Sequence, residues 1–146
     1  EVYVDLGENM NASIELHNMV SPMEGMCEVL PLLATKYQLW TVTARQKSCI
    51  HVIEYLLNKH VPNCITGIHC VWDHIGNNEF RQIPKRDFIM AFEGKKIAFL
   101  DDSAKEILEL QDIIPSYLYD PKGVNSHISE GKRRVRSWKE IGEIFL

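Results

Sequence analysis

The sequence lacks several features that would assign it to a specialised class of protein. No apolar run is long enough to span a bilayer, and there is no signal peptide. Lysine and arginine number 16 against 20 aspartates and glutamates, so no overall basic character favours nucleic acid. Glycine and proline, 8 and 6 among 146 residues, form no linker or low-complexity stretch. These absences predict a cytoplasmic, globular protein that does not enter the membrane.

Cysteine is also scarce, and its pattern excludes the common metal-binding motifs. The four cysteines, Cys27, Cys49, Cys64 and Cys70, include no CxxC pair. Cys64 and Cys70 lie close to three histidines, but their spacing matches no zinc motif and they flank an apolar, strand-like segment. We therefore interpret the cysteines as buried free thiols of a reducing compartment rather than as zinc ligands.

What the sequence does contain is an alternation of strand-like and helix-like segments. Its length and its 45% hydrophobic content fit one domain, residues 1–146, with a substantial core. Alternation of this kind predicts an α/β fold in which helices cover both faces of a mostly parallel sheet, a three-layer α/β/α arrangement. The expected strands are Val2–Asp5, Gln38–Thr43, Ile65–Val71, Lys96–Leu100 and Pro115–Tyr119. The expected helices are Glu24–Lys36, Lys47–Lys59, Arg86–Phe92, one capped by Ser103 and Ser137–Phe145, and the expected loops include Asn9–Pro22 and His74–Ile83.

Acidic residues end two of the predicted strands. Asp5 closes the apolar run Val2-Tyr3-Val4, and Asp101 and Asp102 close Ile97-Ala98-Phe99-Leu100. The carboxyl ends of parallel strands meet at one edge of a sheet, so these acids are expected in one crevice. Clustered carboxylates repel one another, and hard oxygen ligands favour Mg²⁺. Taken alone, Asp5 could equally cap a loop, and Asp101-Asp102 could serve a helix N-terminus.

Four segments of the chain, in order, resemble the four sequence motifs of the haloacid dehalogenase-like superfamily, most of whose members are Mg²⁺-dependent phosphatases. They are Val2–Leu6, Leu39–Arg45 (Leu-Trp-Thr-Val-Thr-Ala-Arg), Lys85 and Ile97–Ser103. A weaker likeness, in Pro22–Tyr37 and the tail from Ser137, points to the deoxyribonucleotidase branch. The resemblance implies a Rossmann-like sheet in one domain, with little or no cap because Asn9–Pro22 is short.

The resemblance also implies roles in catalysis and phosphate binding. Asp5 corresponds to the nucleophile that forms an aspartyl-phosphate. Thr43, with Ala44 and Arg45 beside it, corresponds to the segment that holds the phosphoryl group. Lys85 corresponds to the basic residue that balances the negative charge, although Lys95 and Lys96 are nearby alternatives. Read without the resemblance, Thr43 is an ordinary strand residue and Arg45 a partner in a surface salt bridge.

A Mg²⁺ site follows from the same resemblance. Asp102 corresponds to the main ligand of the fourth motif, with Asp101 as an outer or alternative ligand. Asp5 would contribute its carboxylate, and Gly7 its backbone carbonyl. The metal would offset the repulsion between the nucleophile and the phosphate.

One departure from the motifs concerns catalysis directly. The phosphatases carry a second aspartate, the general acid and base, where this chain has Gly7. Losing such a group costs about two to four orders of magnitude in rate. Glu8 is adjacent, but a side chain one position along points elsewhere.

Three functions therefore remain open. The first is a phosphohydrolase of impaired activity that acts on a phosphorylated small molecule or nucleotide. An open, capless site would also admit a nucleic-acid end or a phosphoprotein. The second is an inactive relative that binds a phosphate ligand or a protein partner. The third is a relative with different chemistry, although the retained acids argue against a dehalogenase. The basic run Lys132–Arg136 is expected to be a solvated surface segment, and Trp40, Trp72 and Trp138 are expected to pack or lie on the surface.

Overall fold

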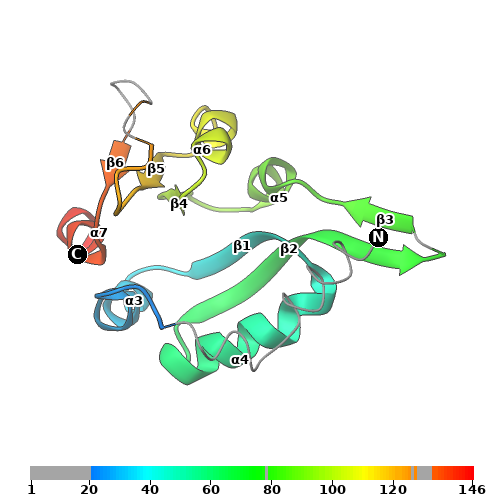
Figure 1. The fold of residues 1–146 in the computed structure, drawn as a ribbon, viewed down its shortest axis with the longest axis horizontal. Helices are drawn as coiled ribbons and strands as arrows, with labels where there is room; N and C mark the ends of the chain where they lie inside the picture. The colour runs from blue at the N-terminus through cyan, green and yellow to red at the C-terminus, as the bar shows by residue number, and fades with distance from the viewer. Residues whose placement is uncertain (1–20, 78, 126, 128–132) are drawn as a thin grey trace.

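A computed structural model describes residues 21–77, 79–125, 127 and 133–146 of the chain (Figure 1). The predicted strand Val2–Asp5 and most of the predicted loop Asn9–Pro22 lie outside the described residues. The described residues form an α/β structure of two small sheets with helices around them. Its helices are α3 (Met26–Ala34), α4 (Ile50–His60), α5 (Lys85–Ala91), α6 (Ala104–Leu110) and α7 (Trp138–Phe145), with a short 3₁₀ helix, η1 (Lys47–Cys49). Its strands are β1 (Leu39–Gln46), β2 (Ile65–Gly76), β3 (Glu79–Gln82), β4 (Phe99–Asp101), β5 (Ser116–Tyr119) and β6 (Arg133–Val135).

The first sheet has the order β1-β2-β3. Strands β1 and β2 are parallel, with Thr43 opposite Cys70, and α4 forms the crossover between them. Helices α4 and α5 lie on opposite sides of this pair in Figure 1. On the α5 side, Trp40 packs against Phe88, with 5.8 Å between ring centroids, and against Phe92 at 5.4 Å. Trp40 thus packs on one side while its side chain stays partly exposed, which agrees with the expectation that it packs or lies on the surface.

The predicted loop at His74–Ile83 is wrong, because most of it is a β-hairpin. Strand β2 continues to Gly76 and turns into β3, which pairs with it antiparallel, with His74 opposite Phe80. Gly76 and Asn77 have φ of 107° and 47°, the left-handed conformations that tight hairpin turns use. The hairpin extends away from the rest of the described residues in Figure 1. The predicted strand Ile65–Val71 is the first part of β2, but the end of β2 and all of β3 escaped prediction because both faces carry polar residues and no apolar alternation marks them.

The second sheet has the order β4-β5-β6 and is parallel throughout. Strand β6 was not predicted, and the interpretation of Lys132–Arg136 as a purely solvated segment is wrong. Arg133 is exposed, but Val135 is only 1% exposed and packs in the core. This strand was not predicted because Val135, its one apolar residue, follows three consecutive basic residues in the sequence. The Val135 side chain is buried in the core.

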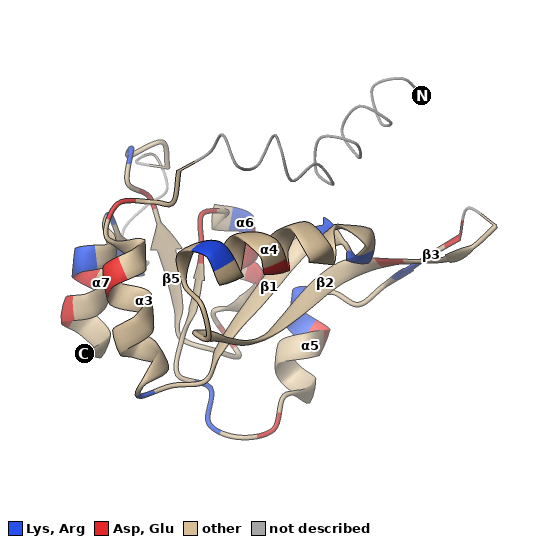
Figure 2. Cartoon of the chain, turned by 90° about the horizontal axis from the view of Figure 1, so that it is seen from below, with Lys and Arg blue, Asp and Glu red and all other residues tan. Residues whose placement is uncertain are grey.

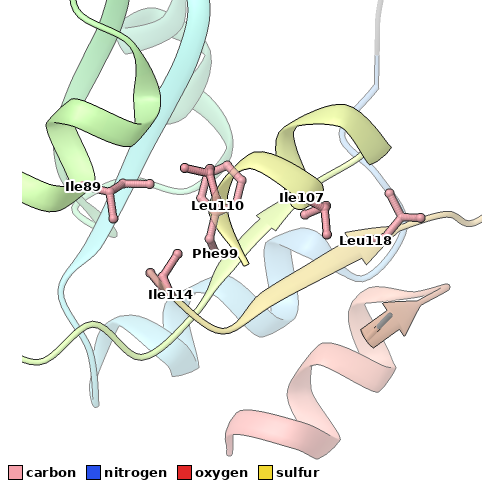
Figure 3. Packing of buried hydrophobic residues seen from close by; sticks show 6 residues of the cluster. All are labelled: Ile89, Phe99, Ile107, Leu110, Ile114 and Leu118. Atoms are coloured by element: carbon pink, nitrogen blue, oxygen red, sulfur yellow. The ribbon is translucent and has the colours of Figure 1, made fainter. Parts of the chain in front are cut away.

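Two clusters of buried side chains hold the second sheet to its helices. The larger cluster joins α5, β4, α6 and β5, and Figure 3 shows its six residues: Ile89, Phe99, Ile107, Leu110, Ile114 and Leu118. In the other cluster, Leu33 of α3 and Ile141 of α7 pack with Val135. Helices α6 and α7 begin as the sequence predicts, since the hydroxyls of Ser103 and Ser137 accept hydrogen bonds from the third residue along. Helix α3 contains Pro31 in its interior and continues through it to Ala34.

Charged residues of both signs are interspersed over the helices and the hairpin in Figure 2. Two ion pairs lie on exposed helix faces, Lys105 with Glu109 and Lys139 with Glu143. In each pair the residues are four positions apart, and the lysine Nζ lies 3.8 Å from the glutamate Oε1. None of the helices among the described residues is long and apolar enough to cross a membrane. The four cysteines are free as expected, but only Cys49 and Cys64 are buried, while Cys27 and Cys70 are partly exposed.

Candidate functional site

The centre of the candidate site is a buried ion pair between α5 and β4. Pro84 precedes α5, so the helix begins at Lys85, whose side chain is only 8% exposed. The Lys85 ammonium donates to Asp101 Oδ2 at 2.7 Å and lies 3.9 Å from Glu106 Oε2. It also lies 5.7 Å from the centroid of the Phe99 ring. Since a buried cation needs a partner, this pair fixes the position of the Lys85 charge.

Asp101 is fully engaged inside the protein. Its Oδ2 accepts from Lys85, and its Oδ1 accepts from the backbone N–H of Ser103 at 2.8 Å. The Ser103 hydroxyl in turn accepts from the N–H of Glu106 at 3.4 Å and caps α6. Asp101 therefore acts as the counter-ion of Lys85 and as an organiser of the loop between β4 and α6.

Asp102 is held differently from its neighbour. The residue is exposed, and among the described residues no donor reaches its carboxylate. Only its backbone carbonyl is engaged, accepting from Asn125 Nδ2 at 3.4 Å. Of the two adjacent acids, Asp101 is thus neutralised by Lys85 inside the protein. The carboxylate of Asp102 faces solvent, and its oxygens are available to a ligand.

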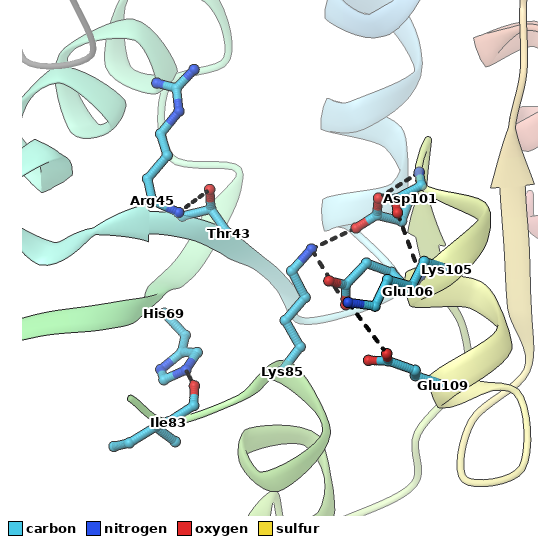
Figure 4. A network of polar contacts seen from close by, with 10 residues as sticks. Thr43, Arg45, His69, Ile83, Lys85, Asp101, Lys105, Glu106 and Glu109 are labelled. Carbon is cyan, nitrogen blue, oxygen red and sulfur yellow. Dashed lines mark hydrogen bonds and ion pairs between the residues drawn. The ribbon is translucent and has the colours of Figure 1, made fainter. Parts of the chain in front are cut away.

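The phosphate-binding residues expected from the sequence lie at the carboxyl end of β1. Thr43 is half-buried, and its Oγ1 accepts from the N–H of Arg45 at 3.3 Å. Because the hydroxyl oxygen accepts this bond, its hydrogen remains to donate elsewhere. Ala44 is exposed between them. Figure 4 shows Thr43 and Arg45 on one side of Lys85, with Asp101 and Glu106 on the other.

Of the residues expected from the motifs, the structure joins Lys85 to Asp101 directly, and Thr43 and Arg45 lie on the other side of Lys85 in Figure 4. Thr43, Ala44 and Arg45 come from β1, Lys85 from α5, and Asp101 and Asp102 from the end of β4. Asp5 and Gly7, the expected residues of the first motif, lie outside the described residues. Of the alternatives Lys85, Lys95 and Lys96, Lys85 is the one that pairs with a motif acid.

The donor chemistry at Asp102 fits Mg²⁺, which prefers carboxylate oxygen. A carboxylate already neutralised by lysine is a weaker candidate, so Asp102 fits better than Asp101. No group of three or more His, Cys, Asp or Glu side chains among the described residues is arranged to hold a metal. The other expected donors, Asp5 and the Gly7 carbonyl, belong to the undescribed part.

A small hollow of about 130 Å³ lies beside this site, between η1 and the hairpin. Lys47 and Arg81 approach Asp73 at its rim, at 3.7 Å and 3.0 Å. His69 stacks on Phe88 with centroids 4.2 Å apart, and its Nε2 lies 3.0 Å from the carbonyl oxygen of Ile83. Asp73 is thus the shared counter-ion of both cations at this rim.

Burial raises the pKa of the Cys70 thiol, which lies between the sheet and η1. The nearby Cys49 raises this pKa further, whereas Arg45 and Lys47 lower it by a smaller amount. A raised pKa keeps the thiol protonated, so Cys70 is not an activated nucleophile.

Sequence reasoning missed one acid that obeys the rule used to find the others. The apolar strand β5 ends directly before Asp120, as β4 ends at Asp101. Asp120 is 1% exposed and faces Arg134 of β6. The segment Tyr117-Leu118-Tyr119-Asp120 carries the same signal, an apolar run that ends in an acid. Its partner, Arg134, lies in β6, which was not predicted.

A scan against models of protein families, a search of curated proteins and a search of solved structures each found no match. The likeness to the haloacid dehalogenase-like superfamily is therefore carried by the motifs alone.

Proposed function

We propose that the chain is a Mg²⁺-dependent phosphohydrolase of the haloacid dehalogenase-like type, cytoplasmic and of impaired activity. The observation that carries the proposal is the buried Lys85–Asp101 pair, which has the threonine of the second motif on one side in Figure 4 and is followed in the chain by the exposed Asp102. The substrate class is a phosphoric monoester, with a nucleotide as the nearest example.

The topology supports a place for the first motif. Among the described residues, β1 ends one sheet and β4 ends the other, so each has an edge without a ladder partner. In Figure 4, Thr43 of β1 and Asp101 of β4 lie on either side of Lys85. A strand formed by Val2–Asp5 between them would join the two into one continuous Rossmann-like sheet and satisfy both edges. Its carboxyl end would then deliver Asp5 to the site.

In the proposed reaction the Asp5 carboxylate attacks phosphorus, and the leaving oxygen departs. Water then hydrolyses the aspartyl-phosphate, which restores Asp5 and releases phosphate. The Thr43 hydroxyl donates to a phosphate oxygen with the hydrogen that Arg45 leaves unused. Lys85 has donors left after binding Asp101 and supplies positive charge. Asp102, Asp5 and the Gly7 carbonyl would hold Mg²⁺, which when bound neutralises negative charge on the nucleophile and phosphate.

Gly7 favours a second candidate function, an inactive domain that binds a phosphate ligand or a protein partner. Without an acid at this position nothing protonates the leaving oxygen, so the enzyme would depend on leaving groups of low pKa. The metal donors are unaffected, because a glycine still offers its carbonyl.

Hydrolysis of an aryl phosphate and a nucleotide panel with Mg²⁺ tests the proposal, using the parent, Asp5→Asn and Gly7→Asp. We expect slow aryl phosphate hydrolysis in the parent and none in Asp5→Asn. Gly7→Asp should raise the rate by about 10²- to 10⁴-fold. A silent parent with a gain in Gly7→Asp would favour the binding domain. No hydrolysis in any variant, together with no Mg²⁺ binding, would overturn the site assignment.

A further inference from the structure

A second buried ion pair lies behind the candidate site, between the ends of β5 and β6. The Asp120 side chain is completely buried, and its Oδ2 lies 3.6 Å from Arg134 Nε, with the arginine side chain 23% exposed. Asp120 Oδ1 has no hydrogen-bond partner among the described residues. A buried charge pair adds little net stability compared with apolar residues of the same size. Its presence therefore calls for a role other than stabilising the core.

The pair holds a single residue, Asn125, by both ends of its backbone. Asp120 Oδ2 accepts from the Asn125 N–H at 3.2 Å. Arg134 Nη2 donates to the Asn125 carbonyl oxygen at 2.6 Å. The loop turns tightly between these contacts, with Gly123 at a φ of 67° and its N–H bonded to the Asp120 carbonyl. The position of Asn125 is thus set by charged hydrogen bonds, which are stronger than neutral ones.

The side chain of Asn125 then reaches the loop that carries the exposed acid. Its Nδ2 donates to the backbone carbonyl of Asp102 at 3.4 Å, from 23 residues away in the chain. On the other side of Asp102, the Ser103 N–H is held by Asp101, which Lys85 holds in turn. The backbone around Asp102 is therefore fixed from two directions while its carboxylate stays exposed.

We infer that Asn125 is a positioning residue for Asp102, with the Asp120–Arg134 pair as its anchor. The inference rests on the proposed function only in taking the Asp102 carboxylate as a Mg²⁺ ligand. A ligand loop held from two sides presents its carboxylate in one orientation, and no ordering is then needed when the metal binds. Partners that orient a metal ligand typically contribute 10- to 100-fold in affinity.

Asn125→Ala tests this role, because it removes the donor to Asp102 without disturbing the buried ion pair. The matched control is Asn58→Ala, at an exposed position on α4 far from the loop in the chain. Three quantities are measured on the full chain: Mg²⁺ affinity by calorimetry, thermal midpoint, and hydrogen exchange of the Ser103 amide. We expect Asn125→Ala to weaken Mg²⁺ binding about tenfold and to speed Ser103 exchange, with a thermal midpoint close to that of Asn58→Ala.

Asp102→Asn separates this inference from the proposed function. If the parent binds Mg²⁺ and Asp102→Asn does not, while Asn125→Ala binds as tightly as Asn58→Ala, the positioning role is wrong and the metal site stands. If the parent binds no Mg²⁺, the metal site is wrong, and Ser103 exchange decides the positioning role. Faster exchange in Asn125→Ala would support that role, and unchanged exchange would contradict it.

Discussion

The two sheets of the molecule hold their functional residues in different ways. In the β4-β5-β6 sheet, the strands pack against two buried clusters, and Asp101 and Asp120 at the strand ends are fixed by buried ion pairs. In the β1-β2-β3 sheet, β3 is exposed along its whole length, and Trp72, Ile75 and Phe80 of the hairpin are exposed. The comparison teaches that the acidic half of the site is preorganised by packing. The half that carries Thr43 and Arg45 is held mainly by backbone pairing and a few aromatic contacts.

The largest expected effect is the loss of the buried cation. Lys85→Met leaves Asp101 buried without its partner, and we expect it to lower the free energy of unfolding by about 3–5 kcal/mol. Lys47→Met in the other half removes a pair with Asp73 whose lysine is 61% exposed, and should cost less than about 1 kcal/mol. Urea unfolding of both variants measures the difference. Equal losses would mean that the two halves are not held differently.

Core truncation sharpens the same contrast. Leu118 is 0% exposed in β5, so Leu118→Ala should cost about 2–5 kcal/mol. Phe80 is 46% exposed on the hairpin, so Phe80→Ala should cost less than about 1 kcal/mol despite its edge contact with His74. Chemical denaturation followed by circular dichroism provides both values. A large loss in Phe80→Ala would show that the hairpin is part of a packed core.

Two glycines, Gly67 of β2 in the first sheet and Gly142 of α7 beside the second, test how tightly their surroundings are packed. A Cβ on Gly67 would lie 2.3 Å from the Trp40 ring, so Gly67→Ala should displace that ring and cost about 1–3 kcal/mol. Gly142 in α7 has its nearest contacts at 3.6 Å, so Gly142→Ala should be neutral or stabilising, because alanine favours a helix. Thermal unfolding of the two variants compares them, and near-ultraviolet dichroism reports on Trp40. A neutral Gly67→Ala would mean that the aromatic contact does not constrain β2.

The smallest expected effect is on the titration of Cys70. Burial raises its pKa above the ordinary 9.0, so a variant with Cys70 as its only cysteine should be alkylated with a pH midpoint above that of a free peptide thiol. In the native state the thiol binds its proton up to higher pH than in the unfolded state. The stability contribution is therefore present below the unfolded pKa and declines as the pH rises through the folded one. Arg45→Gln should raise the midpoint further, and a fall would contradict the assigned surroundings of the thiol.

Much of the second sheet could be predicted from the sequence, because its elements carry strong local signals. Apolar runs mark β4 and β5, and Ser103 and Ser137 mark the starts of α6 and α7. The hairpin and β6 could not be predicted, because their residues are mostly polar or basic and only tertiary packing reveals which side is covered. Asn77 beside Gly76 was the one available sign of the turn.

The candidate site was likewise predictable only where the sequence carries a local signal. Strand ends and motif order predicted Thr43, Lys85, Asp101 and Asp102 as neighbours, and the structure pairs Lys85 with Asp101. The division of labour between Asp101 and Asp102 could not be predicted, because it depends on which carboxylate turns toward Lys85. The Asn125 anchor was equally inaccessible, since it joins residues from three separate segments.

The central proposal is that a strand at Val2–Asp5 would join the two sheets and bring Asp5 to the site. Nuclear Overhauser contacts between backbone protons test it most directly in the isotope-labelled full chain with Mg²⁺. The account predicts contacts from Val4 to both β1 and β4, together with slow amide exchange along the facing edges of those strands. Contacts from β1 directly to β4, or fast exchange along both edges, would contradict it.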